Sequence, residues 1–216
     1  MKQHTENKGS YNLPMRTLTI LSVIFFVMVV MATTFRNRNN ITGNDIQSKK
    51  INEDSVESVR AFDSVYQVLM SPRCLNCHPA GDVPLQGDES HAHTMSPQRG
   101  IDGTGVYAMK CKNCHQDTNT EGLHSPPGNP VWHLPPADMK MVFEGKTAHE
   151  LAKQLLDPEQ NGHKTLEELK EHASDTLVVW GWQPGEGRTL PPLSYEAFKE
   201  AWYTWIDKGA YAPQAE

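Results

Sequence analysis

The chain of 216 residues is long enough for one domain with an appendage. Apolar residues make up 38% of it, and Gly and Pro number 15 each, so side chains that form a large core are scarce. A net charge of −6 excludes a typical nucleic-acid-binding protein, which needs a basic surface. Such a chain needs disulfides, a metal or a large cofactor to hold its fold, and it has four cysteines and ten histidines.

The first feature along the chain is an uncharged, apolar run over residues 17–35, bounded by Arg16 and Arg36. A helix over this run would be about 28 Å long, which matches the hydrocarbon core of a bilayer. Because the run has no polar face, we expect a membrane segment. Two forms stay open: a transmembrane anchor, or a signal peptide cleaved near Val30-Met31-Ala32. For an anchor, residues 1–16 are the cytoplasmic N-terminus.

A polar stretch follows this segment. Residues 36–53 are rich in Asn and Lys and are predicted to be a flexible tether. All but three of the 20 basic residues and all but one of the 26 acidic residues lie beyond residue 35, so this part has a net charge of −8. We therefore expect an acidic domain over residues 54–216.

Four amphipathic helices are predicted within this domain. In each of them apolar residues recur three or four positions apart, which places them on one helix face. Two of the helices open with capping boxes, in which a Thr is followed three residues later by Glu. The predicted helices are Asp54–Met70, a helix capped by Thr147 that ends at Leu156, a short helix capped by Thr165, and a last helix from Ser194 to Lys208.

Two long stretches between these helices, residues 79–105 and 116–138, show no hydrophobic period. They are rich in Gly, Pro, Asp and Asn, and no alternating pattern indicates a β-strand. Loops of this length in a compact domain are usually functional or disordered. We expect a mostly α fold in which helices frame a long, loop-rich insertion.

All four cysteines belong to one motif that occurs twice. The chain reads Cys74-Leu-Asn-Cys77-His78 and Cys111-Lys-Asn-Cys114-His115, which is the C-x-x-C-H pattern of haem c attachment. Two thiols three residues apart can reach the two vinyl groups of one porphyrin, and the adjacent imidazole can bind its iron. We therefore expect two covalently bound haem c groups, whose porphyrins would supply the core that the side chains cannot.

Three other interpretations of the cysteines are open. A zinc site built from two C-x-x-C pairs usually has about 15–20 residues between the pairs, which is fewer than here, and it does not need a His after both. Two disulfides would each close a short loop and constrain little of the chain. A thioredoxin-like redox pair is expected in a βαβ context, which the sequence does not indicate.

The two ends of the domain resemble class I cytochrome c. In that family a helix leads into C-x-x-C-H, as residues 56–70 lead into Cys74–His78, and a closing helix packs across the first. The closing helix often ends Trp-Ile-x-x-Gly-Ala, which matches residues 205–210. Related cytochromes often carry a Met ligand just before a Pro-Pro-Leu-Ser stretch. Here residues 188–190 hold no Met, so the resemblance implies that the second ligand of the first haem comes from the insertion.

Residues 74–212 also resemble a family of small di-haem proteins that are sometimes labelled as subunits of isoquinoline 1-oxidoreductase. Molybdenum enzymes of that kind need iron–sulfur cysteines, and no cysteine here is spare, so the resemblance implies at most an electron acceptor beside a dehydrogenase. The shared stretches are His93-Thr-Met95, Arg99-Gly100-x-Asp-Gly, Trp132-His-Leu-Pro135, Met141-Val-Phe-Glu-Gly145, Asp157-Pro with Asn161-Gly162, and Leu177-Val-Val-Trp-Gly-Trp182.

The second axial ligand of each iron is the open question within the motif-based prediction. It must be a His or a Met, or the position stays open. Our first choices are His93 and His133, because both lie in aperiodic loops and in the stretches shared with the di-haem family. The runners-up are Met95, Met141, His124 and Met139.

These features predict an electron carrier and not an enzyme. It would be a membrane-tethered di-haem cytochrome c that passes electrons between redox partners and binds no nucleic acid. Haem c is attached after export, so the N-terminal helix would cross the cytoplasmic membrane once, with the haem domain in the periplasm or on the outer side. An acidic domain favours a partner with a basic docking face. The alternative is a haem enzyme or sensor, peroxidase-like or gas-binding, with one five-coordinate haem.

Overall fold

The computed structural model describes residues 15–215, except for the side chains of residues 15–18, 21 and 35–45. The chain is partly helical (43%) with little strand. Its contacts divide it into two units, one ending at Ile51 and one beginning at Asn52. The cytoplasmic segment predicted for residues 1–16 lies outside the described residues, except for the backbone of its last two.

The described backbone of the first unit belongs to helix α1 (Met15–Leu69), which continues into the second unit. Large apolar side chains from Ile20 to Met31 are exposed, with Phe25 the most exposed at 73%. Among the described residues, no helix is both long and apolar enough to cross a membrane. The backbone of residues 36–53 is helical, which differs from the predicted tether. No proline lies between Pro14 and Pro72, so every residue there keeps the N–H that a helix needs.

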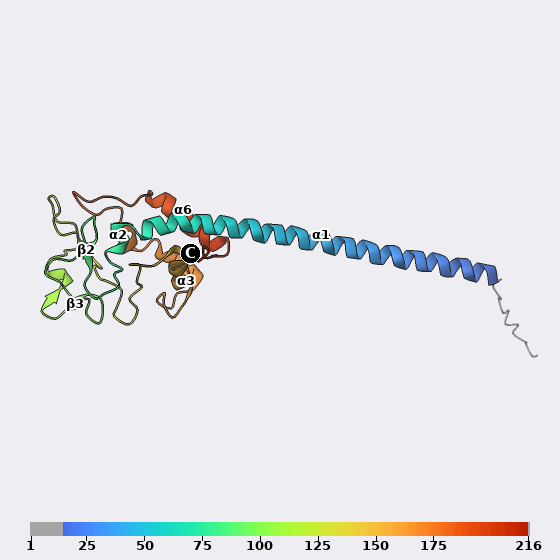
Figure 1. The fold of residues 1–216 in the computed structure, drawn as a ribbon, viewed down its shortest axis with the longest axis horizontal. Helices are drawn as coiled ribbons and strands as arrows, with labels where there is room; N and C mark the ends of the chain where they lie inside the picture. The colour runs from blue at the N-terminus through green and yellow to red at the C-terminus, as the bar shows by residue number, and fades with distance from the viewer. Residues whose placement is uncertain (1–14, 216) are drawn as a thin grey trace, which may run out of the picture. The chain divides into compact units, whose positions relative to one another are not determined.

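The second unit contains the predicted helices and two small hairpins (Figure 1). Both capping boxes are formed, at Thr147 and Thr165, and the Ser194 hydroxyl accepts from the N–H of Ala197. The hairpins and the short helices α2 and α5 were not predicted. The helices after α1 are α2 (Pro72–Leu75), α3 (Ala148–Leu156), α4 (Leu166–His172), α5 (Thr176–Trp180) and α6 (Tyr195–Asp207). The strands β1 (Leu85–Gln86) and β2 (His91–Ala92) pair antiparallel, as do β3 (Gly105–Val106) and β4 (Met109–Lys110).

A side-chain core joins the end of α1 to α3, α4 and α6. The rings of Phe62 and Trp205 lie 4.7 Å apart, and the buried Ser58 hydroxyl donates to the Trp205 carbonyl at 2.8 Å. This core was not expected, since the sequence suggested that porphyrins would replace it. The fully buried large residues at its centre are Phe62, Val65, Val68, Leu151, Leu169 and Trp205.

The loop-rich part of the unit, residues 79–140, is organised differently. Pro79 and Leu134 are its buried apolar side chains of any size, and neither belongs to the helical core cluster. Its centre is Arg99, whose side chain is 1% exposed and donates to the carbonyls of Gly81 and Pro135. Arg99 also pairs with Asp82 at 3.3 Å. Polar contacts of one buried cation therefore fasten three loop segments that no apolar core holds.

Candidate functional site

Both C-x-x-C-H motifs form a single tight turn. The first begins on α2, and the second begins on the 3₁₀ helix η1 (Cys111–Asn113). In each motif the N–H of the second cysteine donates to the carbonyl of the first at 3.1 Å, Cys77 to Cys74 and Cys114 to Cys111. One turn therefore separates the two thiols of each motif, as attachment to a single porphyrin requires.

His78 of the first motif is fixed on two sides. Its Nδ1 lies 2.6 Å from the carbonyl oxygen of Met141, and its ring stacks on Phe143 with centres 3.8 Å apart. A carbonyl oxygen only accepts, so Nδ1 carries the proton and the Nε2 lone pair remains for a metal. Burial lowers the pKa of His78 to about 4, so the imidazole is neutral at physiological pH, as a ligand must be.

His115 of the second motif repeats this arrangement. Its Nδ1 lies 2.7 Å from the Pro127 carbonyl oxygen, and its ring stacks on Trp132 with centres 4.4 Å apart and planes at 10°. Burial lowers the pKa of His115 as well. Both histidines thus present a neutral Nε2, held by a backbone carbonyl and an aromatic ring from a distant segment.

All four cysteines, which the structure describes, are free thiols. Burial raises the pKa of Cys74 to about 12 and that of Cys77 to about 11, and it also raises the pKa of Cys111. Protonated thiols are poor nucleophiles and poor redox catalysts. These environments therefore argue against the thioredoxin-like interpretation of the pairs.

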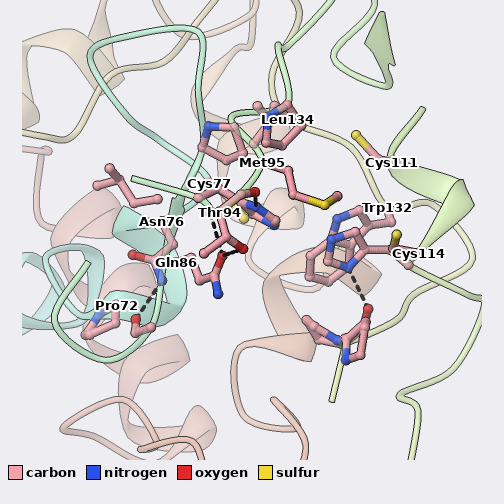
Figure 2. Close-up of a pocket in the computed structure, with 18 of the residues that line it drawn as sticks. Pro72, Asn76, Cys77, Gln86, Thr94, Met95, Cys111, Cys114, Trp132 and Leu134 are labelled. Carbon is pink, nitrogen blue, oxygen red and sulfur yellow. Dashed lines mark hydrogen bonds between the residues drawn. The ribbon is translucent and has the colours of Figure 1, made fainter. Parts of the chain in front are cut away.

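A cavity of about 310 Å³ connects the two motifs. Cys77 of the first motif lines it, together with Cys111, Cys114 and His115 of the second. Figure 2 shows the two thiols of the second motif on one side of the cavity and Pro72 on the other. Apolar walls with a few polar groups are typical of cofactor sites.

Across this cavity His93 faces His115. Their ring centres are 6.2 Å apart and their planes meet at 69°. Two imidazoles on opposite faces of one metal have ring centres about 6 Å apart, since each metal–nitrogen bond is about 2 Å long. Nδ1 of His93 lies 2.6 Å from the Thr94 carbonyl, which again leaves Nε2 free. The donor set of the second motif therefore fits a six-coordinate iron porphyrin.

Two of the runners-up also line the cavity. Met95 is 68% exposed with a left-handed φ of 66°, and His124 is exposed with a φ of 56°. His124 makes no ring contact with His115 like that of His93. Met95 and His124 therefore stay predicted alternatives that line the same cavity.

The other predicted ligands lie elsewhere. Within the described part of the chain, the cavity lining includes neither His133 nor Met139 nor Met141. His133 is exposed, with its Nδ1 at 2.8 Å from the Leu134 carbonyl. Met141 packs against the helical core and meets His78 through its carbonyl, on the ring edge away from Nε2. The cavity lining includes neither Cys74 nor His78, so these three residues stay predictions for the first haem.

Several residues of the site were missed by the sequence prediction. Phe143 stacks on His78, and Arg99 holds the loops around the cavity. Both fall in stretches for which the sequence suggested a resemblance to di-haem proteins, which was the available signal. Nothing local in the sequence marks the buried Arg73 or the half-buried Arg188, which also line the cavity.

No family model, no curated protein and no solved structure matches this chain. Over the described residues, no group of three or more His, Cys, Asp or Glu is placed to hold a bare metal ion. The roles of the site residues are therefore inferred from the two motifs and from the geometry around them.

Proposed function

We propose that this chain is a membrane-tethered di-haem c-type cytochrome that carries electrons between redox partners outside the cytoplasm. The observation that supports it best is the pair of imidazoles in the second site. The ring centres of His93 and His115 lie 6.2 Å apart, and both residues line a cavity that Cys111 and Cys114 also line. One covalent iron porphyrin would use all four side chains.

In this proposal the protein binds and orients, and it makes or breaks no substrate bond. Bound haem would supply a one-electron iron couple. Cys74 and Cys77 would attach one porphyrin and Cys111 and Cys114 the other. His78 and His115 would each present Nε2 to iron while a backbone carbonyl fixes the ring orientation. Because Cys77 lines the cavity of the second motif, the two porphyrins would be neighbours.

The proposed tether is the apolar run over residues 17–35. Its described side chains from Ile20 to Met31 are exposed, as lipid-facing side chains would be. Export would place the acidic haem domain in the periplasm or on the outer face of the membrane. Propionates would add negative charge, so docking on a basic partner face should weaken with salt.

The direct test is production of the full chain in a host with haem c maturation enzymes, followed by mass spectrometry and a reduced pyridine spectrum. The proposal expects a mass increase of two haems. The double variants Cys74→Ser/Cys77→Ser and Cys111→Ser/Cys114→Ser should each keep one haem. A product with the bare polypeptide mass, or with zinc, would overturn the proposal.

Carbon monoxide separates an electron carrier from a haem enzyme or gas sensor. If both irons are six-coordinate, the reduced protein should bind carbon monoxide slowly or not at all. Rapid binding at the Cys74–His78 haem would identify an open position there and favour the enzyme or sensor.

A further inference from the structure

The charges around the cavity differ from those of the chain as a whole. The chain has a net charge of −6, yet the charged residues that line the cavity are all cationic: Arg73, Lys110 and Arg188. No Asp or Glu belongs to the described lining. A cavity with apolar walls and cationic side chains is suited to an apolar ligand that carries negative groups.

Arg73 provides the sharpest observation. Its side chain is only 3% exposed, and its Nε is buried without a hydrogen-bond partner. Its Nη2 donates to Asp88 at 2.6 Å and to the Gly87 carbonyl at 3.3 Å. Native structures rarely leave a buried charged donor unsatisfied, so this group needs an acceptor from outside the chain.

Arg188 adds a second cation close to the first. Burial, and then the positive charge of Arg73, lower the pKa of Arg188. Its guanidinium donates to the carbonyls of Ser125 and Pro184, which carry no charge. The carboxylate of Asp88 is bonded to Arg73 and to the N–H of Thr189, whereas the half-buried Arg188 makes no ion pair with it. The pair therefore has an excess positive charge.

We propose that Arg73 and Arg188 bind a carboxylate, and that this carboxylate is a propionate of the haem attached at Cys111 and Cys114. The assignment rests on the proposed function. In a porphyrin the propionates lie on the side away from the two vinyl groups. Figure 2 shows Pro72, the residue before Arg73 in the chain, on the side of the cavity away from Cys111 and Cys114. In the proposed assignment the thiols would hold the vinyl edge of the porphyrin and the two arginines its propionate edge.

The test is a redox titration of the holoprotein at mildly alkaline pH, where carboxylates stay ionised. Loss of a nearby positive charge destabilises the reduced iron. Arg73→Gln and Arg188→Gln should therefore each lower the midpoint potential of one haem by about 59 mV. That shift corresponds to a roughly tenfold change in the ratio of reduced to oxidised iron at a fixed potential. Arg73→Lys keeps the positive charge, so its midpoint potential should stay close to that of the wild type. The potential of the other haem should change little in all three variants. Arg60→Gln, an exposed arginine on α1, is the control with the same loss of charge.

Three results would overturn the assignment. Equal midpoint potentials for Arg73→Gln, Arg188→Gln and Arg60→Gln would show that no propionate binds at these arginines. A shift of the wild-type potential on addition of acetate or citrate, lost in Arg73→Gln, would identify a free carboxylate as the ligand instead. If Arg73→Gln fails to retain haem, Arg188→Gln decides alone, and a potential equal to that of Arg60→Gln overturns it. A wild-type chain without haem would refute the proposed function itself, which keeps the two failures distinct.

Discussion

The two motif histidines are held in the same way by two regions that are built differently. Phe143, which stacks on His78, belongs to the apolar core formed with α1, α3, α4 and α6. Trp132, which stacks on His115, belongs to the loop-rich region of residues 79–140. That region is fastened by Arg99 and by close backbone approaches, and it surrounds the cavity.

The difference indicates how each region reaches its folded state. The helical region buries a cluster of large apolar side chains, and this burial favours its folding. The loop region has many backbone hydrogen bonds but little apolar burial, so conformational entropy opposes it strongly. We infer that the loop region depends on a bound cofactor, whereas the helical region depends on its side-chain core.

Removal of the cysteines that would attach the second haem should have the largest effect. It should destabilise the loop region and leave the helical region folded. In Cys111→Ser/Cys114→Ser, residues 79–140 should lose nearly all protection from amide hydrogen exchange, while α3 and α6 stay protected. Cys74→Ser/Cys77→Ser is the matched variant, and its helical core should also remain protected. Full protection of the loops without the second haem would contradict the inference.

Truncation of the core should test the helical region alone. Trp205 is fully buried between Phe62 and Trp202. Trp205→Ala should lower the free energy of unfolding by about 3–5 kcal/mol because it leaves a large cavity. Denaturant titration followed by circular dichroism measures the loss. The same titration of Trp132→Ala should show a smaller loss and a change in the spectrum of the second haem.

A glycine in the loop region should matter through close packing. A Cβ at Gly128 would lie 2.1 Å from the Thr118 carbonyl oxygen and 2.4 Å from that of Gln116. Gly128→Ala should displace the preceding Pro127 carbonyl and destabilise the holoprotein by about 1–3 kcal/mol. The spectrum of the second haem should change more than that of the first. Gly81→Ala, where the nearest atom is 4.0 Å away, should leave both spectra unchanged.

Acid should weaken the loop region through Asp82, with the smallest effect. Hydrogen bonds from Lys140 and Arg99 lower the pKa of Asp82. The unfolded chain therefore binds the proton more readily, and the stabilisation is complete above the ordinary pKa of about 3.9. It is lost as the pH falls through the lower folded value. Thermal melts of Asp82→Asn should show a weaker acid dependence than wild type, whereas those of Asp63→Asn, an exposed control on α1, should not.

The helices could be predicted because their signals are local. Thr147 with Glu150 and Thr165 with Glu168 form the capping boxes that their spacing indicates. The apolar face of α6 is buried as its period predicts. The two C-x-x-C-H motifs could also be recognised from the sequence, because each consists of five consecutive residues in one turn. The backbone of residues 36–53 is helical although the composition is polar, because a polar stretch without proline is still able to form a helix.

The loop region could not be predicted because its order depends on contacts far apart in the sequence. Arg99 meets the Pro135 carbonyl 36 residues later, and Trp180 donates to Asn119 across 61 residues. No hydrophobic periodicity in the sequence predicts such contacts. For the same reason His93 and His133 looked equivalent in the sequence, although only His93 lines the cavity.

The double anchoring of His78 and His115 has a consequence for speed. Each ring is clamped between a main-chain oxygen and a flat aromatic neighbour, so it has little freedom to swing or tilt when the charge beside it changes. In the proposed di-haem cytochrome, ligands held this firmly would keep the reorganisation energy of electron transfer small. We therefore expect fast tunnelling between the two proposed haems, with the slow step at the encounter between proteins.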